Sequence, residues 1–260
     1  MGFKTKLDVI VDCETVNVYA PVWNMENWDR AIFNVGITAV ERISRTVICS
    51  KEIGIDKIWS VPKRFIQDFY RKNFTRADFH MMFSSFKDFA PYFNELLDDW
   101  SKQYSIELWS YNAMFDSNAF FVNADREGVK LHKLTKDWKC IMMLTAHYLS
   151  YGTAAIQFCN WSVEQAYCDY LNGRGVARVL EFITPIGNVR TTAQNVHRFL
   201  SQNPEFIELH KGLADTECEM DILKWCQGHS GWTKINAEPG IGWRLVNNSF
   251  EMGRNGFDSR

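Results

Sequence analysis

The chain has 260 residues, 46% of them hydrophobic, which is enough to bury a substantial core and excludes a disordered protein. Its formal net charge of −2 excludes a strongly basic protein that coats long nucleic-acid duplexes. Seven cysteines without a C-x-x-C spacing indicate neither a disulfide framework nor a zinc site, and no apolar run reaches membrane-spanning length, so we expect a cytoplasmic protein without a membrane partner.

The first elements expected along the chain are strands. Residues 7–15, LDVIVDCET, form an almost continuous apolar run that predicts a buried strand. Residues 16–30 are polar, aromatic and Pro-containing, which indicates a loop. Residues 31–42 and 45–55 are rich in Val and Ile and predict two more strands, joined by a short turn. Three successive strands with short connections favour an antiparallel meander.

The middle of the chain alternates between helix and strand. Residues 60–104 are helical in character, with apolar side chains at three-to-four spacing in their last part. A fourth strand is predicted at 106–112, followed by a helix at 114–128 that Gly128 ends. The run WKCIMMLTA at 138–146 predicts a fifth, buried strand.

The last third of the chain is predicted to be mainly helical. Capping-box patterns at 162–165 and 191–194 predict two helix starts, and 177–192 has the alternation and Gly-Asn turn of a small hairpin. A final helix is expected at 213–226. The whole order predicts an α/β protein with a mixed five-stranded sheet, built from the three-stranded meander and two further strands and flanked by helices.

Carboxylates occupy places in this order where burial is predicted. Asp12 and Glu14 end the first strand, and residues two apart on a strand project from the same face, so these like charges repel unless a positive group joins them. Asp116 follows the fourth strand, and Asp215 lies in the last helix, five residues after His210. Five residues turn a regular helix by about 140°, so His210 and Asp215 share a site only if His210 lies on the loop or the first turn.

The three motifs that carry these acids together resemble those of the DEDDh 3′→5′ exonuclease superfamily, the proofreading-type nucleases with an RNase H-like fold. D-x-E-T occurs at 12–15, N-x-x-F-D at 112–116 and H-x-x-x-x-D at 210–215. Each motif alone is weak, because an acid is also common at a strand-end turn or a helix N-terminus. All three in the family's order, on the first strand, after the fourth strand and at the final helix, are specific.

The resemblance also implies a domain organisation. We expect an exonuclease domain over 1–227, with insertions at about 16–30, 60–87 and 177–192, where the resemblance is weaker. Residues 228–260 are expected to form an irregular C-terminal tail. The insertions bear on the choice of substrate, whereas the motifs bear on the chemistry.

The chemistry of phosphodiester hydrolysis explains the choice of acids. Two divalent ions about 3.5–4 Å apart activate the attacking water and stabilise the departing 3′ oxygen, and Mg²⁺ and Mn²⁺ prefer oxygen ligands. The resemblance implies that Asp12 bridges both ions and that Glu14 and Asp215 complete the shell of the first. It also implies that Asp116 holds the second ion and that His210 accepts the proton of the water, a task that suits imidazole near neutral pH.

Further residues are candidates for contacts with substrate. Aromatic rings such as Trp23 stack on terminal bases, although they equally cover a core, and cations near the predicted hairpin track a phosphate backbone, although a solvated surface explains them equally well. Cys13 alternates to the opposite face of the first strand, so we expect it to be a buried small apolar residue. The candidates are Thr15, Asn112, Phe115, Trp23, Arg190 and Lys211.

The function expected from this resemblance is a metal-dependent 3′→5′ exonuclease that acts on the 3′ ends of single-stranded DNA or RNA. DNA is favoured because no RNA-binding module is recognisable in the sequence. Two alternatives remain open, an RNase H-like module that binds nucleic acid or a protein partner without cleavage and a hydrolase of small phosphodiesters or nucleotides. Four converging acids argue against a module that only binds.

Overall fold

The structure is a computed structural model, in which the described residues are 4–16, 31–56, 68–149, 152–185, 188–235 and 237. Of the loop predicted at 16–30, only Val16 is among the described residues, which resume at Ala31. Trp23 lies outside them. Most of the predicted tail at 228–260 is also outside the described part. Among the described residues, no helix is both long enough and apolar enough to span a bilayer.

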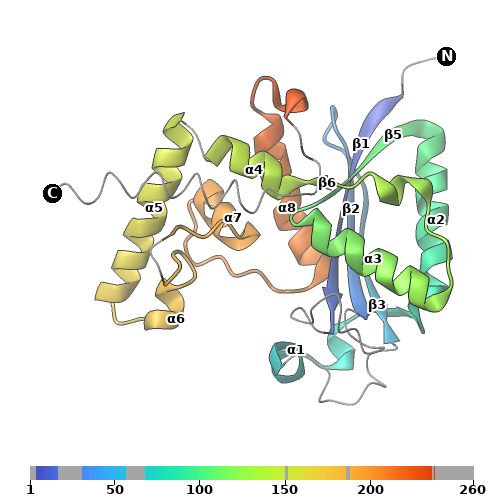
Figure 1. Cartoon of the computed structure of the whole chain (residues 1–260), viewed down its shortest axis with the longest axis horizontal. Coiled ribbons are helices and arrows are strands. Elements are labelled where there is room, and N and C mark those ends of the chain that lie inside the picture. Colours follow the sequence, from blue (N-terminus) through green and yellow to red (C-terminus); the bar gives the residue numbers. More distant parts are fainter. Residues whose placement is uncertain are drawn as a thin grey trace. The chain divides into compact units, whose positions relative to one another are not determined.

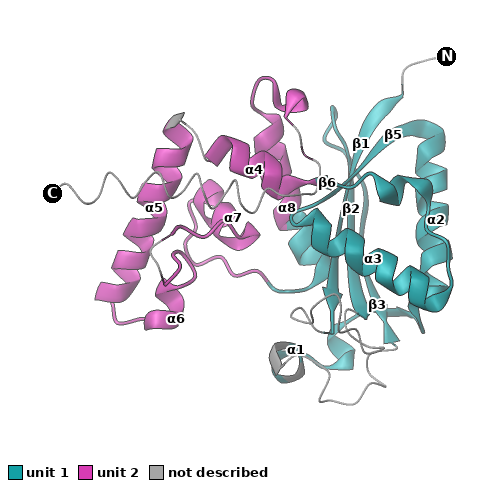
Figure 2. Ribbon diagram, viewed as in Figure 1, with its two compact units in different colours: residues 1–139, 209–217 teal, residues 140–208, 218–260 magenta. Residues whose placement is uncertain are grey.

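The chain divides into two compact units, which Figure 2 distinguishes by colour. The first unit consists of Met1–Lys139 together with Leu209–Glu217. The second unit consists of Cys140–Glu208 together with Cys218–Arg260. The chain therefore leaves the first unit after Lys139 and returns to it for a short stretch before the final helix is complete.

The first unit is built around a mixed sheet of six strands, in the order β4-β3-β2-β1-β5-β6 (Figure 1). The three-stranded antiparallel meander is confirmed, and β5 runs parallel to β1. The expectation of an α/β mixed sheet is therefore confirmed, with six strands in place of five. The strands are β1 (Thr5–Thr15), β2 (Ile32–Glu41), β3 (Val47–Ile55), β4 (Met81–Phe83), β5 (Tyr104–Ser110) and β6 (Lys139–Cys140).

The register of β1 against β2 determines which side chains share a face. Asp12 lies opposite Gly36 and Glu14 lies opposite Asn34. The register then shifts, because Thr15 pairs with Ile32. Phe33 consequently has no partner in β1 and forms a β-bulge, a feature that bends a strand and redirects its side chains.

Two helices of the first unit pack against the sheet. The first, α2 (Phe86–Gln103), begins at Ser85, whose side chain accepts a hydrogen bond from the Asp88 N–H, and its buried face is aromatic. The second, α3 (Ala113–Glu127), ends as predicted at Gly128, whose φ of 65° lies in the left-handed region. Phe89 packs edge-on to Phe120, and burial of each such ring contributes roughly 1.5–3 kcal/mol.

The segment predicted to be helical at 60–104 is more varied than expected. Its described part begins with α1 (Asp68–Asn73) and a 3₁₀ turn, η3 (Arg76–Asp78), and then forms β4 before α2 begins. The short strand pairs with β3 only around Gly54 and Ile55. The prediction extended the helical character of α2 to the residues before it. Tertiary pairing places these residues in a strand at the edge of the sheet instead.

The fifth strand predicted at 138–146 is wrong for most of its length. Only Lys139–Cys140 is a strand, and Ile141–Leu149 forms the helix α4. A short, fully apolar run has no polar face from which its period can be read, and the Met, Leu and Ala in this run favour a helix. A further 3₁₀ turn, η4 (Lys133–Lys136), precedes this region.

The second unit is helical, and it corrects two further expectations. The capping pattern at Ser162 does not start a helix, because Ser162 lies buried inside α5 (Gly152–Leu171). The pattern at 191–194 does lie at a helix start, α7 (Ala193–Ser201), but one residue early, since the N-cap is Thr192, whose side chain accepts from the Asn195 N–H. A four-residue capping pattern is short enough to recur by chance inside a helix.

The predicted hairpin at 177–192 is reduced to one bridge between Ile183 and Val189, preceded by α6 (Val176–Val179), and the turn residue Gly187 lies outside the described part. The helix predicted at 213–226 is confirmed as α8 (Gly212–Gln227), and the short turn η5 (Trp232–Lys234) follows it.

Candidate active site

Two acids project from one face of β1 near its end. Asp12 and Glu14 alternate with Cys13, whose side chain is buried as expected, and residues two apart on a strand share a face. Asp12 is half-buried, whereas Glu14 is buried. Their cross-strand partners, Gly36 and Asn34, therefore lie on the same face of β2.

The start of α8 is fastened to this face of β2. The Gly212 N–H donates to Asn34 Oδ1 at 2.7 Å, and the hydroxyls of Thr38 and Thr216 lie 2.8 Å apart. Between these contacts a Cβ placed on Gly36 would lie 1.9 Å from the Gly212 carbonyl carbon, so the two backbones touch directly. The first turn of α8 is thus held beside the acid pair of β1.

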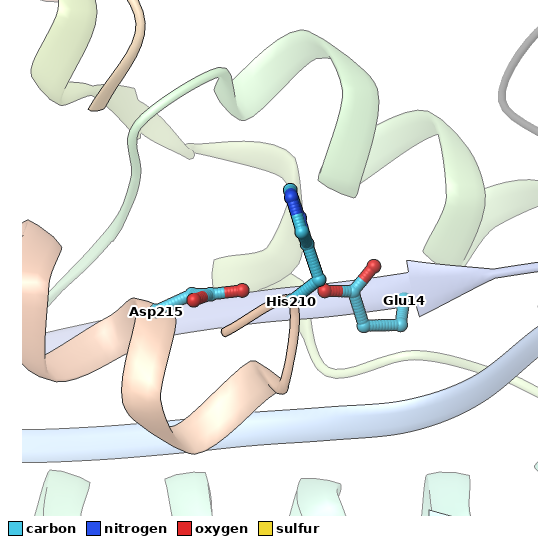
Figure 3. Close-up of side chains that lie close together, drawn as sticks. All are labelled: Glu14, His210 and Asp215. Carbon is cyan, nitrogen blue, oxygen red and sulfur yellow. The ribbon is translucent and has the colours of Figure 1, made fainter. Parts of the chain in front are cut away.

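His210 and Asp215 meet the condition that the sequence sets for a shared site. His210 lies on the loop before α8 with a φ of 52°, and Asp215 lies in the first turn of the helix. One donor atom from each of Glu14, His210 and Asp215 lies within 4.8 Å of the others. Figure 3 shows the carboxylates of Glu14 and Asp215 directed toward one another.

Asp116, in the first turn of α3, reaches the backbone of β1. Its Oδ1 accepts from the Cys13 N–H at 3.0 Å, and its Oδ2 accepts from the Ser110 hydroxyl. Burial raises the pKa of Asp116 to about 6, although both hydrogen bonds lower it. Burial also raises the pKa of Cys13 well above its ordinary value, followed by the charges of Asp116 and Asp12.

Tyr70 contacts one of the acids at the end of β1. Its hydroxyl donates to Glu14 Oε2. The pKa of Tyr70 is raised well above its ordinary value, mainly by burial and next by the charge of Glu14, with smaller effects from Asp12 and Asp215. The phenol therefore stays protonated and acts as a hydrogen-bond donor.

The imidazole of His210 is in the form that a general base requires. Burial lowers the pKa of His210 from its ordinary value, because the charged ring loses solvation. The neutral imidazole then predominates at neutral pH, with one nitrogen available to accept a proton.

The donor set suits a divalent cation with oxygen ligands. Buried carboxylates that converge repel one another, and a cation between them reverses this repulsion. Glu14 and Asp215 offer carboxylate oxygens beside His210, and no thiolate is part of this cluster, which fits Mg²⁺ or Mn²⁺ better than a softer metal. The residues grouped here therefore fit a divalent ion.

The predicted contacts with substrate have different surroundings. Thr15 is buried, and its hydroxyl has no hydrogen-bond partner among the described residues. Asn112 is the N-cap residue of α3 without a side-chain capping bond, and Phe115 is half-buried one residue before Asp116. Asn112 and Phe115 thus flank the start of the helix that carries an acid.

The two predicted cations, Lys211 and Arg190, differ in how their side chains are engaged. The Lys211 ammonium donates to the Asp78 carbonyl at 2.9 Å. Arg190 belongs to the second unit, where its backbone N–H donates to the Phe182 carbonyl at 2.8 Å, and its buried Nε has no hydrogen-bond partner among the described residues. In the same unit Arg174, Arg178 and Arg198 form ion pairs with carboxylates, as the buried Arg198 does with Glu181 at 2.8 Å.

Sequence reasoning missed the residues that hold this site together, namely Asn34, Gly36 and Tyr70. A glycine inside a strand indicates a close backbone approach, so Gly36 carried a readable hint. Asn34 is a polar residue in an otherwise apolar strand, which is a weaker hint. Nothing in the neighbouring sequence distinguishes Tyr70 from the other eight tyrosines in the chain.

No protein-family model matches the sequence, and a search of the curated proteins found no match. Solved structures do match. The nuclease domain of 3′hExo, a DEDDh family member, bound to rAMP, matches with a TM-score of 0.52 at 11% identity, over 86% of this chain and 92% of that one. A 3′-exonuclease in a structure of 3′-end specific recognition of histone mRNA stem-loop matches with a TM-score of 0.55 at 11% identity, over 88% and 84%.

A full-length 3′-exonuclease matches with a TM-score of 0.53 at 10% identity, over 91% of this chain and 86% of that one. At such low identity the likeness concerns the fold. The predicted resemblance is confirmed at that level, and the chain has the fold of the DEDDh-family 3′-exonucleases.

Proposed function

We propose that this protein is a metal-dependent 3′→5′ exonuclease that hydrolyses phosphodiester bonds at the 3′ ends of single-stranded nucleic acid. The observation that carries the proposal is the convergence of Glu14, His210 and Asp215 within 4.8 Å, from β1 and the start of α8. Asp12 lies on the same face of β1 as Glu14, so the arrangement concentrates negative charge that would repel a substrate phosphate unless divalent cations lie between them.

The resemblance to the DEDDh exonucleases assigns a role to each acid. Asp12 would bridge two divalent ions, with Glu14 and Asp215 completing the shell of the first, and Asp116 would hold the second from the start of α3. When bound, the ions would supply Lewis acidity toward the phosphate and stabilise charge on the departing 3′ oxygen. The chain itself supplies four carboxylates fixed by β1, α3 and α8.

His210 would act as the general base. Its pKa is lowered by burial, so the ring is neutral at neutral pH and accepts the proton of the attacking water. Its place on the loop before α8, with one ring nitrogen within 4.8 Å of carboxylate oxygens of Glu14 and Asp215, supports this role. A general base of this kind typically contributes about 10²–10⁴-fold in rate.

An assay on end-labelled strands tests the proposal. Purified protein is incubated with 3′-labelled and 5′-labelled single-stranded DNA and RNA, in Mg²⁺, Mn²⁺ or a chelator. We expect mononucleotides to leave the 3′ end in metal only, and Asp12→Asn, which keeps the side-chain shape, to be inactive. Polymers that stay intact in both metals would overturn the proposal.

The same assay decides the sugar and the competing functions. We propose DNA as the first substrate, and RNA is included because solved neighbours are described with rAMP and with a histone mRNA stem-loop. Retention of labelled strands without cleavage would point to a binding module. Hydrolysis of bis(p-nitrophenyl) phosphate with intact polymers would point to a small phosphodiester as substrate.

A further inference from the structure

We propose that Tyr70 is a positioning residue of the candidate metal centre, and that its hydroxyl fixes the Glu14 carboxylate in the orientation that holds a divalent cation. This inference rests on the proposed function and deepens it. It gives a role to α1, which lies outside the three sequence motifs and within the segment where the resemblance is weaker.

The contact between Tyr70 and Glu14 joins residues that are 56 positions apart in the chain. The Tyr70 hydroxyl donates to Glu14 Oε2, and both side chains are buried. One carboxylate oxygen is thereby held by the protein, and the carboxylate plane is fixed relative to Asp215 and His210. Such partners of metal-binding groups typically change metal affinity or activity by about 10–100-fold when they are removed.

The ring of Tyr70 is itself held in place by other aromatic rings. Phe33 packs edge-on against it with ring centroids 5.0 Å apart, and Phe74 lies 6.1 Å away. Phe33 is the bulge residue of β2, which has no partner in β1. Val16 and Phe79 belong to the same buried cluster. A phenol with two side-chain torsions and several packed neighbours keeps its hydroxyl in one place.

The same cluster also supports the loop that carries His210. The ammonium of Lys211 lies 5.9 Å from the ring centroid of Phe74 and 5.6 Å from that of Phe79. It also donates to the Asp78 carbonyl, in the 3₁₀ turn after α1. One aromatic cluster therefore contacts Glu14 through Tyr70 on one side and the His210 loop through Lys211 on the other.

A purely structural role for Tyr70 makes a different prediction. A ring that only fills the core matters through its apolar surface, and Tyr70→Phe keeps that surface while it removes the hydroxyl. The two roles are therefore separated by metal affinity rather than by stability. Tyr92→Phe is the matched control, because it removes a phenol hydroxyl whose partner is Lys51, on β3.

The test measures Mn²⁺ binding by calorimetry, together with kcat and KM on a single-stranded oligonucleotide. We expect Tyr70→Phe to unfold at a temperature close to that of the wild type. We also expect it to bind Mn²⁺ about 10-fold more weakly and to lose about 10–100-fold in kcat with little change in KM. Higher Mn²⁺ concentrations should restore part of the lost kcat, and Tyr92→Phe should match the wild type throughout.

The outcomes separate this inference from the proposed function. A wild-type protein that neither binds Mn²⁺ nor cuts nucleic acid overturns both. A wild type that binds and cuts, with a Tyr70→Phe variant of equal Mn²⁺ affinity and kcat, overturns the positioning role alone. If Tyr70→Phe does not fold, Phe33→Leu replaces it, since that change loosens the ring and keeps both polar partners. Unchanged Mn²⁺ affinity in Phe33→Leu then overturns the inference.

Discussion

Asp12 is half-buried, whereas the other three acids of the candidate site are buried. It lies on β1 opposite Gly36, against which the backbone of Gly212 packs. The most accessible acid is thus the one expected to bridge two ions.

Replacement of Asp12 by Ala should remove metal binding and leave the fold intact. The change deletes one of several like charges, so the free energy of unfolding should stay the same or rise. Calorimetry should show Mn²⁺ affinity reduced by more than about 100-fold, because a direct ligand matters more than a supporting group. An unchanged affinity for Mn²⁺ would count heavily against the assigned role.

His210 has a φ of 52°, in a region that costs a residue other than glycine roughly 1–2 kcal/mol. His210→Asn and His210→Ala both remove the base, so kcat should fall at least about 100-fold in each, with Mn²⁺ binding retained. Asn tolerates this backbone conformation better than Ala, so His210→Asn should be the more stable variant by urea unfolding. Full activity in either variant would exclude His210 as the general base.

The acids could be predicted from the sequence, because their spacing and order are local facts about Asp12, Glu14, Asp116 and Asp215. Tyr70 could not be predicted, because its contact with Glu14 depends on how α1 folds back across the end of β1. No periodicity specifies that return. Residue types in a sequence thus indicate which side chains are candidates for the chemistry, whereas the residues that hold those side chains in place depend on tertiary packing.

At the scale of elements, the direct contact between β2 and the start of α8 should be sensitive to any added side chain. Gly36→Ala would place a Cβ 1.9 Å from the Gly212 backbone, and overpacking of this kind costs about 3 kcal/mol or more. Gly128→Ala is the matched control, since its Cβ would meet nothing within 4 Å and only its φ is unfavourable. Urea unfolding should show a loss of about 1–2 kcal/mol for that control, and equal losses would contradict the close contact.

A cluster of charges joins β1, β5 and β6 around Glu107. Lys6, Arg42 and Lys139 lie 2.8, 2.6 and 2.9 Å from its carboxylate oxygens. Burial alone would raise the pKa of Glu107, but the hydrogen bonds from these cations outweigh it and lower the pKa to about 2. The folded state therefore holds the Glu107 carboxylate more firmly in its charged form than the unfolded chain does.

This depressed pKa predicts a loss of stability in acid. The stabilisation is fully present above the unfolded pKa of 4.5 and disappears as the pH falls through the folded value of about 2. Urea unfolding between pH 6 and pH 3 should show a loss of roughly 2–3 kcal/mol from this group. In Glu107→Gln the same window should be flatter, and an identical pH profile in the variant would exclude Glu107 as the cause.

Elements with one polar face were predicted well, and elements without one were not. The α2 helix is amphipathic, and it lies within the segment that was predicted to be helical. Apart from Lys139 and Thr145 the run at 138–146 is apolar, so neither period could be read from it, and it is mostly the helix α4. The second unit therefore contains more helix than the sequence indicated.

At the scale of the whole molecule, the formal net charge of −2 limits how much phosphate backbone the protein neutralises. A grip on two or three phosphates of a single strand predicts that log K falls with log salt with a slope of about −2. Fluorescence anisotropy of a labelled oligonucleotide with the inactive Asp12→Asn protein measures this slope. A slope steeper than about −4 would show a longer basic track.

The first unit is completed by Leu209–Glu217, which follow the greater part of the second unit in the chain. A fragment cut after Lys139 would keep Asp12, Glu14 and Asp116 but would lack His210 and Asp215. No single C-terminal truncation ahead of Glu217 therefore keeps both the whole first unit and the whole candidate site. A shortened protein that keeps the candidate site would require an internal deletion within 140–208, with a linker that rejoins β6 to the loop of His210.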